Sequence, residues 1–460
     1  MDLSFIARIG RLWPLALTAL FLVGSVGWAV AQTQLSPDQT RVLTIQLLKQ
    51  GNPTAARTVA LLLLERDQDD RVAWLALMQA ALALGEPGHA ALAGRQAYRL
   101  TQNPGERFAL ARQVSQQHVL AGQITRAQWW MRKALNDAPT PQAKQVAGNE
   151  FIRIRRSNPL TMRLNFSAAP NNNVNNGSSS DTINIFGLPF VLSPDARALS
   201  GIEVSAGVDL KYRLAQGQDR ATDIGLKLFG RTFELSNAAQ AAAPDVSGSD
   251  YSFALAEAFL MQTRRFPNTS GPTTLVLTVG KNWYATAPYS RYGRLTVAQS
   301  YQLADTTGLV VSGGYERQIS ISGGGTPSDI FTLGTTVNHR LQNRDALGLS
   351  LRLQETTSPD VNLENTSVKA GARYGFGKPV LGTKFSLSMS VEKRDYDVSV
   401  YDLAGRHDLT LSAGAAMVFP GISYFGFSPS FSVEASRTES NVNIFDRDSV
   451  ALRMGVQSNF

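Results

Sequence analysis

The sequence predicts an α+β multidomain protein, in which an α-helical repeat domain precedes a 14-stranded antiparallel transmembrane β-barrel. Gly51, Gly85 and Gly122 each follow an apolar helical segment, at intervals of 34 and 37 residues, and such a period is typical of helical repeats. After Pro159 the helical spacing gives way to alternating apolar and polar residues. Many of these alternating segments run for roughly 10–13 residues, and a tilted strand needs about 9–11 to cross a bilayer.

Composition narrows the class of protein. The chain has 460 residues, of which 17% are charged and 43% hydrophobic, and it has no cysteine. Disulfides, thiol chemistry and thiolate metal sites are therefore excluded. The formal net charge is +8, but the basic residues are dispersed and an export signal precedes them, so nucleic acid is not an expected partner.

The N-terminus has the form of an export signal. Arg8 and Arg11 precede an uncharged, mostly apolar stretch that ends in Ala29-Val30-Ala31, the small-x-small pattern of a signal-peptidase site. We expect cleavage after Ala31, which makes 1–31 the signal peptide, 32–157 a periplasmic helical domain and 158–460 the barrel. The alternative is an uncleaved membrane helix. No other stretch approaches the ~20 apolar residues that a membrane helix needs.

The helical region predicts three helix pairs, at 36–66, 70–102 and 106–138, and a capping helix at 140–156. Its spacing resembles tetratricopeptide repeats, most closely between Leu120 and Pro139. Adjacent helical residues point ~100° apart, so Trp129 and Trp130 cannot both face the core. We expect one of them to be exposed, either as a contact for a client protein or packed against the barrel rim.

The barrel region predicts fourteen strands, near 160–168, 200–214, 221–233, 250–263, 273–283, 293–302, 308–320, 329–340, 346–356, 365–376, 383–395, 407–418, 425–437 and 448–460. An even number places both ends of the barrel on the periplasmic side. Longer connections, 284–292 among them, are expected outside the cell and shorter turns in the periplasm. The chain ends on Phe460, and a terminal aromatic residue on the last strand is the usual signal to the barrel assembly machinery.

Two hairpins and the domain order carry a family resemblance. The segment 164–176 contains a strand followed by the Asn-rich run with Asn171, Asn172, Asn173 and Asn175, and 440–447 precedes the last strand. Together with the signal, helical domain and fourteen strands, these features resemble the surface lipoprotein assembly modulator family. The Asn residues are a candidate element of the barrel mouth or lumen, because Asn favours compact turns. The alternative is a disordered surface loop.

The resemblance implies a protein translocator that moves client surface lipoproteins or secreted binding proteins across the outer membrane. Its implied partners are the client, a periplasmic chaperone, the barrel assembly machinery and outer-membrane lipid. It supplies no catalytic residue, and neither an enzyme nor a cofactor is expected. The alternatives are an outer-membrane pore for small solutes and a polysaccharide export channel.

Site chemistry is sparse in the sequence. The four histidines are scattered without metal-ligand spacing, so no metal site is expected. Carboxylates such as Glu203 and Asp209 have no nucleophilic serine with a histidine partner. Lumen cations are expected either to form cross-strand ion pairs or to set the field of the pore; they are Arg163, Lys211, Arg213, Lys227, Arg352 and Arg453.

Overall fold

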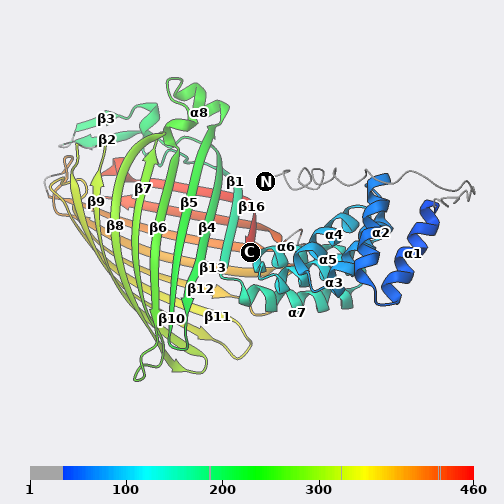
Figure 1. The fold of residues 1–460 in the computed structure, drawn as a ribbon. Helices are drawn as coiled ribbons and strands as arrows, with labels where there is room; N and C mark the ends of the chain where they lie inside the picture. The colour runs from blue at the N-terminus through cyan, green and yellow to red at the C-terminus, as the bar shows by residue number, and fades with distance from the viewer. Residues whose placement is uncertain are drawn as a thin grey trace, which may run out of the picture.

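The computed structural model describes residues 35–185, 188–322, 324–402, 404–422, 424 and 426–459. Seven helices lead into a closed barrel in this part of the chain (Figure 1). The predicted signal peptide and Phe460 lie outside the described residues. The helices are α1 (Pro37–Lys49), α2 (Pro53–Arg66), α3 (Arg71–Ala83), α4 (Pro87–Arg99), α5 (Pro104–Leu120), α6 (Ile124–Asp137) and α7 (Pro141–Ser157).

The helices form the three predicted pairs followed by a capping helix. Gly51, Gly85 and Gly122 have φ angles of 73°, 71° and 71°, the left-handed conformation that glycine adopts readily at the end of a helix. Each therefore ends the first helix of its pair and allows a tight turn into the second. No helix in the described part of the chain is both long and apolar enough to span a membrane.

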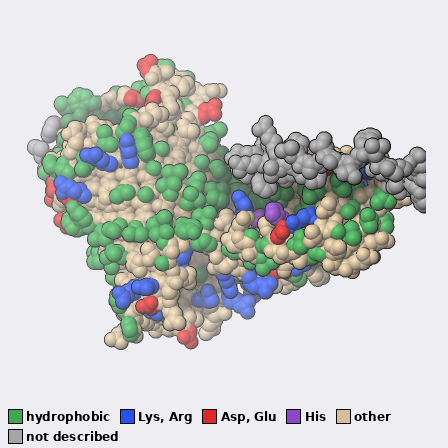
Figure 2. Space-filling model, viewed as in Figure 1, with side chains coloured by type: hydrophobic (Ala, Val, Ile, Leu, Met, Phe, Trp, Pro, Cys, Tyr) green, Lys and Arg blue, Asp and Glu red, His purple; other side chains and the backbone are tan. Residues whose placement is uncertain are grey.

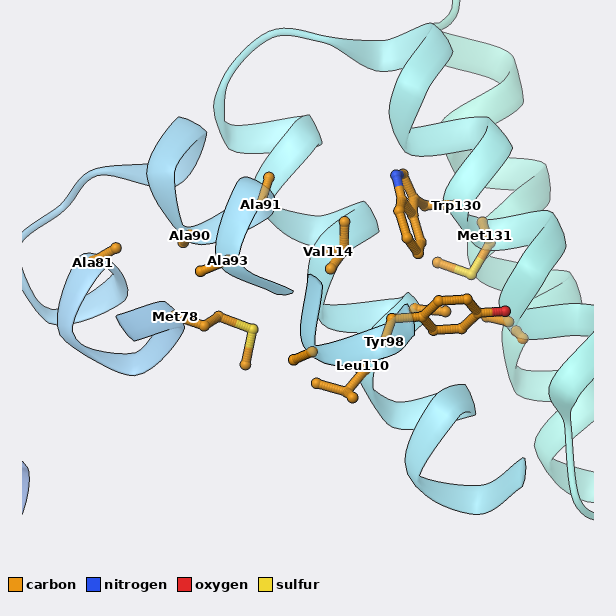
Figure 3. Packing of buried hydrophobic residues seen from close by; sticks show 14 residues of the cluster. Met78, Ala81, Ala90, Ala91, Ala93, Tyr98, Leu110, Val114, Trp130 and Met131 are labelled. Carbon is orange, nitrogen blue, oxygen red and sulfur yellow. The ribbon is translucent and has the colours of Figure 1, made fainter. Parts of the chain in front are cut away.

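The core of the helical domain is made of small side chains with a few large ones (Figure 3). Trp130 is 3% exposed, and its ring meets Tyr98 edge to face at 5.1 Å between centroids. Gly94 lets α4 approach its neighbours, because a Cβ there would lie 2.6 Å from Val114 and 2.8 Å from Met78. The small residues thus set the spacing between helices, and the aromatic pair closes the core beneath α6.

Fourteen antiparallel strands close the barrel, with β1 paired to β16. This confirms the predicted number and order. The barrel strands are β1 (Leu160–Asn171), β4 (Gly201–Gln216), β5 (Arg220–Leu235), β6 (Phe253–Arg264), β7 (Thr273–Tyr284), β8 (Ala287–Ala304), β9 (Thr307–Ser320), β10 (Pro327–Arg340), β11 (Ala346–Thr357), β12 (Asn365–Gly375), β13 (Lys384–Tyr396), β14 (Arg406–Val418), β15 (Phe427–Ser440) and β16 (Arg447–Asn459).

The register separates the two faces of the wall. Leu351 pairs with Thr335 and Ala370, and Ser350 pairs with Thr336 and Gly371. Leu351 belongs to the exposed apolar outer face, whereas Ser350 lines the internal cavity. Apolar side chains cover much of the barrel wall in Figure 2. An apolar exterior around a polar lumen is the arrangement of a barrel embedded in lipid.

The predicted outer loop at 284–292 is wrong. β7 ends at Tyr284 and β8 begins at Ala287, so only Ala285 and Thr286 connect them. Both have positive φ angles, 47° and 65°, as a two-residue hairpin turn of this twist requires. Neither residue is a typical turn former, so the local sequence contains no signal for a two-residue turn.

The long connections contain elements that the sequence did not predict. A small hairpin, β2 (Thr182–Ile185) with β3 (Leu188–Val191), and helix α8 (Asn237–Ala242) lie at the barrel end opposite the helical domain (Figure 1). Val174, Leu199, Phe233 and Ala239 belong to a small buried cluster beneath α8. Two loops far apart in the sequence therefore pack together at this mouth.

Candidate functional site

The lumen contains a cavity of about 990 Å³. Its lining is rich in Ser, Gly, Ala and Arg, and includes no Phe, Tyr or Trp among the described residues. Aromatic side chains do face inward on β5, β6 and β8, but they pack against the wall: Tyr292 covers Gly280, and Phe259 covers Gly225. The open part of the lumen is therefore polar and charged.

Part of the lumen charge is neutralised within the wall. Arg453 reaches Glu434 at 3.1 Å and Glu203 at 3.4 Å, and Arg213 pairs with Asp223. Arg294 contacts Glu316 at 2.6 Å and Glu257 at 3.4 Å. These pairs cross between strands, so the ion-pair interpretation holds for Arg213 and Arg453, with Lys211 at a looser 4.0 Å from Asp223.

Five lumen cations have no carboxylate partner in the part of the chain that the structure describes. Arg163, Lys227 and Arg352, and also Arg340 and Arg373 in the cavity lining, form no ion pair within the described residues. Strand positions that face the lumen carry fifteen Lys and Arg residues and eight Asp and Glu residues, a net charge of +7. The lumen therefore has a cationic field.

The Asn-rich run forms a compact turn at the barrel mouth. Asn173 is buried, donates to the carbonyls of Gly177 (2.9 Å) and Asp448 (3.3 Å), and accepts from Gly177. Asn175 donates to Asp195 and Arg197. This network favours the turn over the alternative of a disordered loop.

The first two Asn residues link the ends of the barrel sheet. Asn172 accepts from the backbone N–H of Val450 at 2.7 Å, and Asn171 accepts from Ser449 at 3.3 Å. Asn171 also lines the lumen cavity. All four side chains therefore hold β1, β16 and the first long loop together beside the mouth.

The adjacent tryptophans of α6 point in different directions. Trp130 lies in the core, whereas Trp129 is 47% exposed. The rings meet edge to face at 5.5 Å, and the Lys133 ammonium lies 4.0 Å from the centroid of Trp129 and 4.4 Å from that of Trp130. Trp129 is thus the member of the pair that presents an aromatic surface to solvent.

Half-buried hydrogen bonds and one buried arginine lie where the helical domain meets the barrel. Asn158 donates to Gln128 at 2.7 Å and accepts from Thr125 at 3.1 Å and from the backbone N–H of Leu160 at 3.1 Å. Arg132, 4% exposed, lies over the Phe151 ring at 5.3 Å. Burial lowers the pKa of Arg132 to about 9, and the charge of Arg155 adds to the effect.

Two features of this junction were not recognised in the sequence. The Asn158-Pro159 dipeptide marks only the end of a helix, and Arg132 has the spacing of an ordinary surface cation. Arg132 packs beside Gly426 in the β14–β15 turn, where an added Cβ would lie 2.9 Å from its Nε. A contact across nearly 300 residues of chain leaves no local signal.

No group of three or more metal-binding side chains occurs among the described residues. Glu203 and Asp209 do not form an isolated carboxylate pair, because Glu203 contacts Arg453 and lies 4.0 Å from Arg231. The arrangement suits passage or binding of charged groups.

A closed barrel with an apolar exterior and a charged lumen, joined to a helical repeat domain, defines a β-barrel of the outer-membrane channel type. No family model and no curated protein matches the chain. Among solved structures, the channel OccAB3 of Acinetobacter baumannii covers 65% of this chain and 99% of its own at 8% identity, with a TM-score of 0.36. The KdgM porin covers 45% and 92% at 14% identity, with a TM-score of 0.25.

The helical region is similar to a different protein. SycD, the type III secretion translocator chaperone of Yersinia enterocolitica, covers 29% of this chain and 95% of its own at 18% identity, with a TM-score of 0.24. TM-scores this low leave function to be argued from the residues of this chain.

Proposed function

We propose that this protein is an outer-membrane translocator that moves specific client proteins, surface lipoproteins or secreted binding proteins, from the periplasm to the cell surface. One observation carries the proposal: a helical repeat domain packs against one end of a polar-lined barrel, through Asn158 at the start of β1 and through the buried Arg132 beside Gly426. Repeat domains usually bind polypeptides, and a pore for small solutes has no need of one. The resemblance to the surface lipoprotein assembly modulator family supports the same function.

The chain direction supports a placement of the two domains relative to the membrane. β1 begins and β16 ends at the barrel end that carries the helical domain (Figure 1). In outer-membrane barrels both termini lie in the periplasm. We therefore place the helical domain in the periplasm, with β2, β3 and α8 at the cell surface.

The test compares surface-labelled proteomes of the parent strain, a deletion strain and the deletion strain complemented with the wild-type gene. We expect one or a few proteins to leave the surface in the deletion strain, to accumulate inside, and to return on complementation. An unchanged surface proteome would contradict translocation.

A pore for anionic solutes is the second candidate. It is favoured by the open cavity of about 990 Å³ and by its unpaired Arg340 and Arg373. A polysaccharide channel receives less support, because the cavity lining offers no aromatic platform among the described residues.

A further inference from the structure

Trp129 lies among cations of α4 and α6. Lys133 spans Trp129 and Trp130, and it also lies 5.0 Å from the centroid of the Tyr98 ring. Burial lowers the pKa of Lys133, and the charges of Arg107 and Arg95 lower it further, while the charge of Asp137 partly opposes them. The charges of Arg126 and Arg95 act in the same way on His118. Arg126, Trp129 and Lys133 stand three and four positions apart on α6 and therefore share one face of that helix. The charge of Arg95 on α4 acts on Lys133. We call this group the Trp129 patch: Arg95, Arg126, Trp129 and Lys133.

Carboxylates near the patch already have partners. Asp137 accepts from Tyr98 at 2.6 Å and from Arg107 at 3.3 Å. Glu106 pairs with Arg71 at 2.6 Å, and Glu150 pairs with Arg112. Arg95, Arg126 and Lys133 form no ion pair in the described part of the chain; Arg126 donates to Gln123 instead. The patch therefore keeps its positive charge.

The excess positive charge of the helical domain lies in the half of its sequence that contains this patch. Residues 36–158 hold sixteen Lys and Arg against nine Asp and Glu, whereas 159–460 hold twenty-six of each. Within the helical domain, 95–158 contain eleven basic and three acidic residues, and 36–94 contain five and six. The half of the domain nearest the barrel is thus strongly basic. Figure 2 shows Lys and Arg side chains gathered where the two domains meet.

Trp129 does not occupy a core position of the helical domain. Trp130 fills the core position, and Trp129 leaves about half of its side chain in solvent. An exposed tryptophan beside unpaired cations is a typical composition for a protein-binding surface. Carboxylates of a bound segment would pair with Arg95, Arg126 and Lys133, while an apolar side chain covers the indole.

We propose that the Trp129 patch docks an acidic segment of polypeptide in which carboxylates alternate with apolar side chains. The proposal rests on the proposed function, since the segment would belong to the client. It also states a substrate class: clients that carry an acidic segment. The lumen beyond, with a net charge of +7 on its strand positions, would favour the same sign of charge.

The test measures binding by fluorescence anisotropy with the full-length protein in zwitterionic detergent. The probe is a fluorescein-labelled peptide in which Glu alternates with Leu; the comparison peptides carry Gln or Lys in place of Glu. We expect the Glu peptide to bind, the Gln and Lys peptides to bind at least ~10-fold more weakly, and the complex to weaken as added salt shortens the range of the charges.

Two double variants distinguish binding at the Trp129 patch from binding to exposed apolar and basic side chains in general. Trp129→Ala with Lys133→Gln should weaken the Glu peptide at least ~10-fold, equivalent to about 1.4 kcal/mol. Leu62→Ala with Arg66→Gln removes an exposed apolar side chain and a cation from α2 and should leave binding unchanged. Circular dichroism checks that both variants remain folded, and Lys133→Glu provides a charge reversal at the same surface.

Equal binding of the Glu and Lys peptides, or equal losses in the two variants, would overturn the proposal. So would binding to vesicles with anionic phosphatidylglycerol that the patch variant abolishes while the peptide remains unbound, since the patch would then be a lipid contact. Peptide binding and the surface proteome are independent measurements. A patch that binds the peptide without any change in the surface proteome would disprove the proposed function alone.

Discussion

At the scale of residues, a few buried side chains determine how the two domains meet. The Asn158 side chain forms hydrogen bonds with two side chains of α6 and with the backbone N–H of Leu160, the first residue of β1. Arg132 packs between Phe151 and Gly426. Polar contacts at this junction help to hold the orientation of the two domains, because these groups lose their partners if the domains separate. Single substitutions here should affect both domains.

Gly426→Ala should destabilise the β14–β15 turn. Gly426 has a φ of 86°, and an added Cβ would lie 2.9 Å from Arg132 Nε. A left-handed conformation costs a non-glycine residue about 1–3 kcal/mol, so we expect a loss of that size in the free energy of unfolding, measured by urea titration in detergent. Gly421→Ala in the same turn meets no atom within 4 Å and is the control. Equal losses would contradict the close contact.

His118 should make the helical domain sensitive to acid. Burial lowers its pKa, and the contact with Gln123 only partly offsets this. The folded state resists protonation, so stability is complete above about pH 6.5, the ordinary pKa of histidine, and declines as the pH falls below it. Thermal unfolding of the helical signal from pH 7.5 to 5.5 should show this decline. It should be shallower in His118→Gln and unchanged in His89→Gln, an exposed control; an identical slope in all three would contradict the assignment.

The sequence indicated only in part which side chains are buried and which form ion pairs. Helical geometry required that Trp129 and Trp130 diverge, but it did not say which one is buried. That depends on Tyr98, which lies 32 residues away and forms the edge-to-face contact with Trp130. The ion pairs of Arg213 and Arg453 likewise depend on strand register, which a pattern of alternation does not supply.

At the scale of elements, regular segments were predictable and irregular ones were not. The glycines with positive φ ended the helices as expected, and all fourteen barrel strands were found in order. β6 alternates poorly because Phe253, Leu255 and Phe259 face inward opposite apolar outer positions. The β2–β3 hairpin and α8 were missed because they are stabilised by a small cluster assembled from distant loops.

The β7–β8 turn should gain stability from residues that suit it. Ala285 and Thr286 both have positive φ, which Asn and Gly adopt more readily. Ala285→Asn with Thr286→Gly should raise the free energy of unfolding by about 1 kcal/mol, measured by urea titration. The matched control is Asp305→Asn with Thr306→Gly in the two-residue β8–β9 connection, where neither residue has positive φ. A gain in the control alone would contradict the turn geometry.

At the scale of the whole molecule, charge is arranged along the barrel axis. The loops at the end opposite the helical domain contain nine Asp and Glu and a single Arg197. The lumen and the helical domain carry the excess of positive charge. A negatively charged polypeptide or solute would therefore be attracted into the barrel from the helical domain. At the other mouth it would meet the negatively charged Asp and Glu side chains of the loops.

This arrangement predicts anion selectivity for any current through the barrel. In a planar bilayer with a KCl gradient, the reversal potential should show a preference for chloride. Arg340→Gln with Arg373→Gln removes two cavity cations and should reduce that preference. Lys281→Gln with Arg291→Gln removes two outward-facing cations and should not. A preference for potassium in the wild type would contradict the cationic lumen.

The central claim is that a polypeptide passes from the helical domain through the lumen, and site-specific photocrosslinking in living cells tests it most directly. A photoreactive amino acid is placed at one of three positions: Trp129, Ser350 in the lumen, or Leu351 on the outer face. Ser350 and Leu351 are adjacent residues of one strand, so they compare the two faces of the wall at the same height. We predict that Trp129 and Ser350 capture the same client polypeptide and that Leu351 captures none. Capture at Trp129 with no polypeptide at Ser350, or equal capture at Ser350 and Leu351, would contradict passage through the barrel.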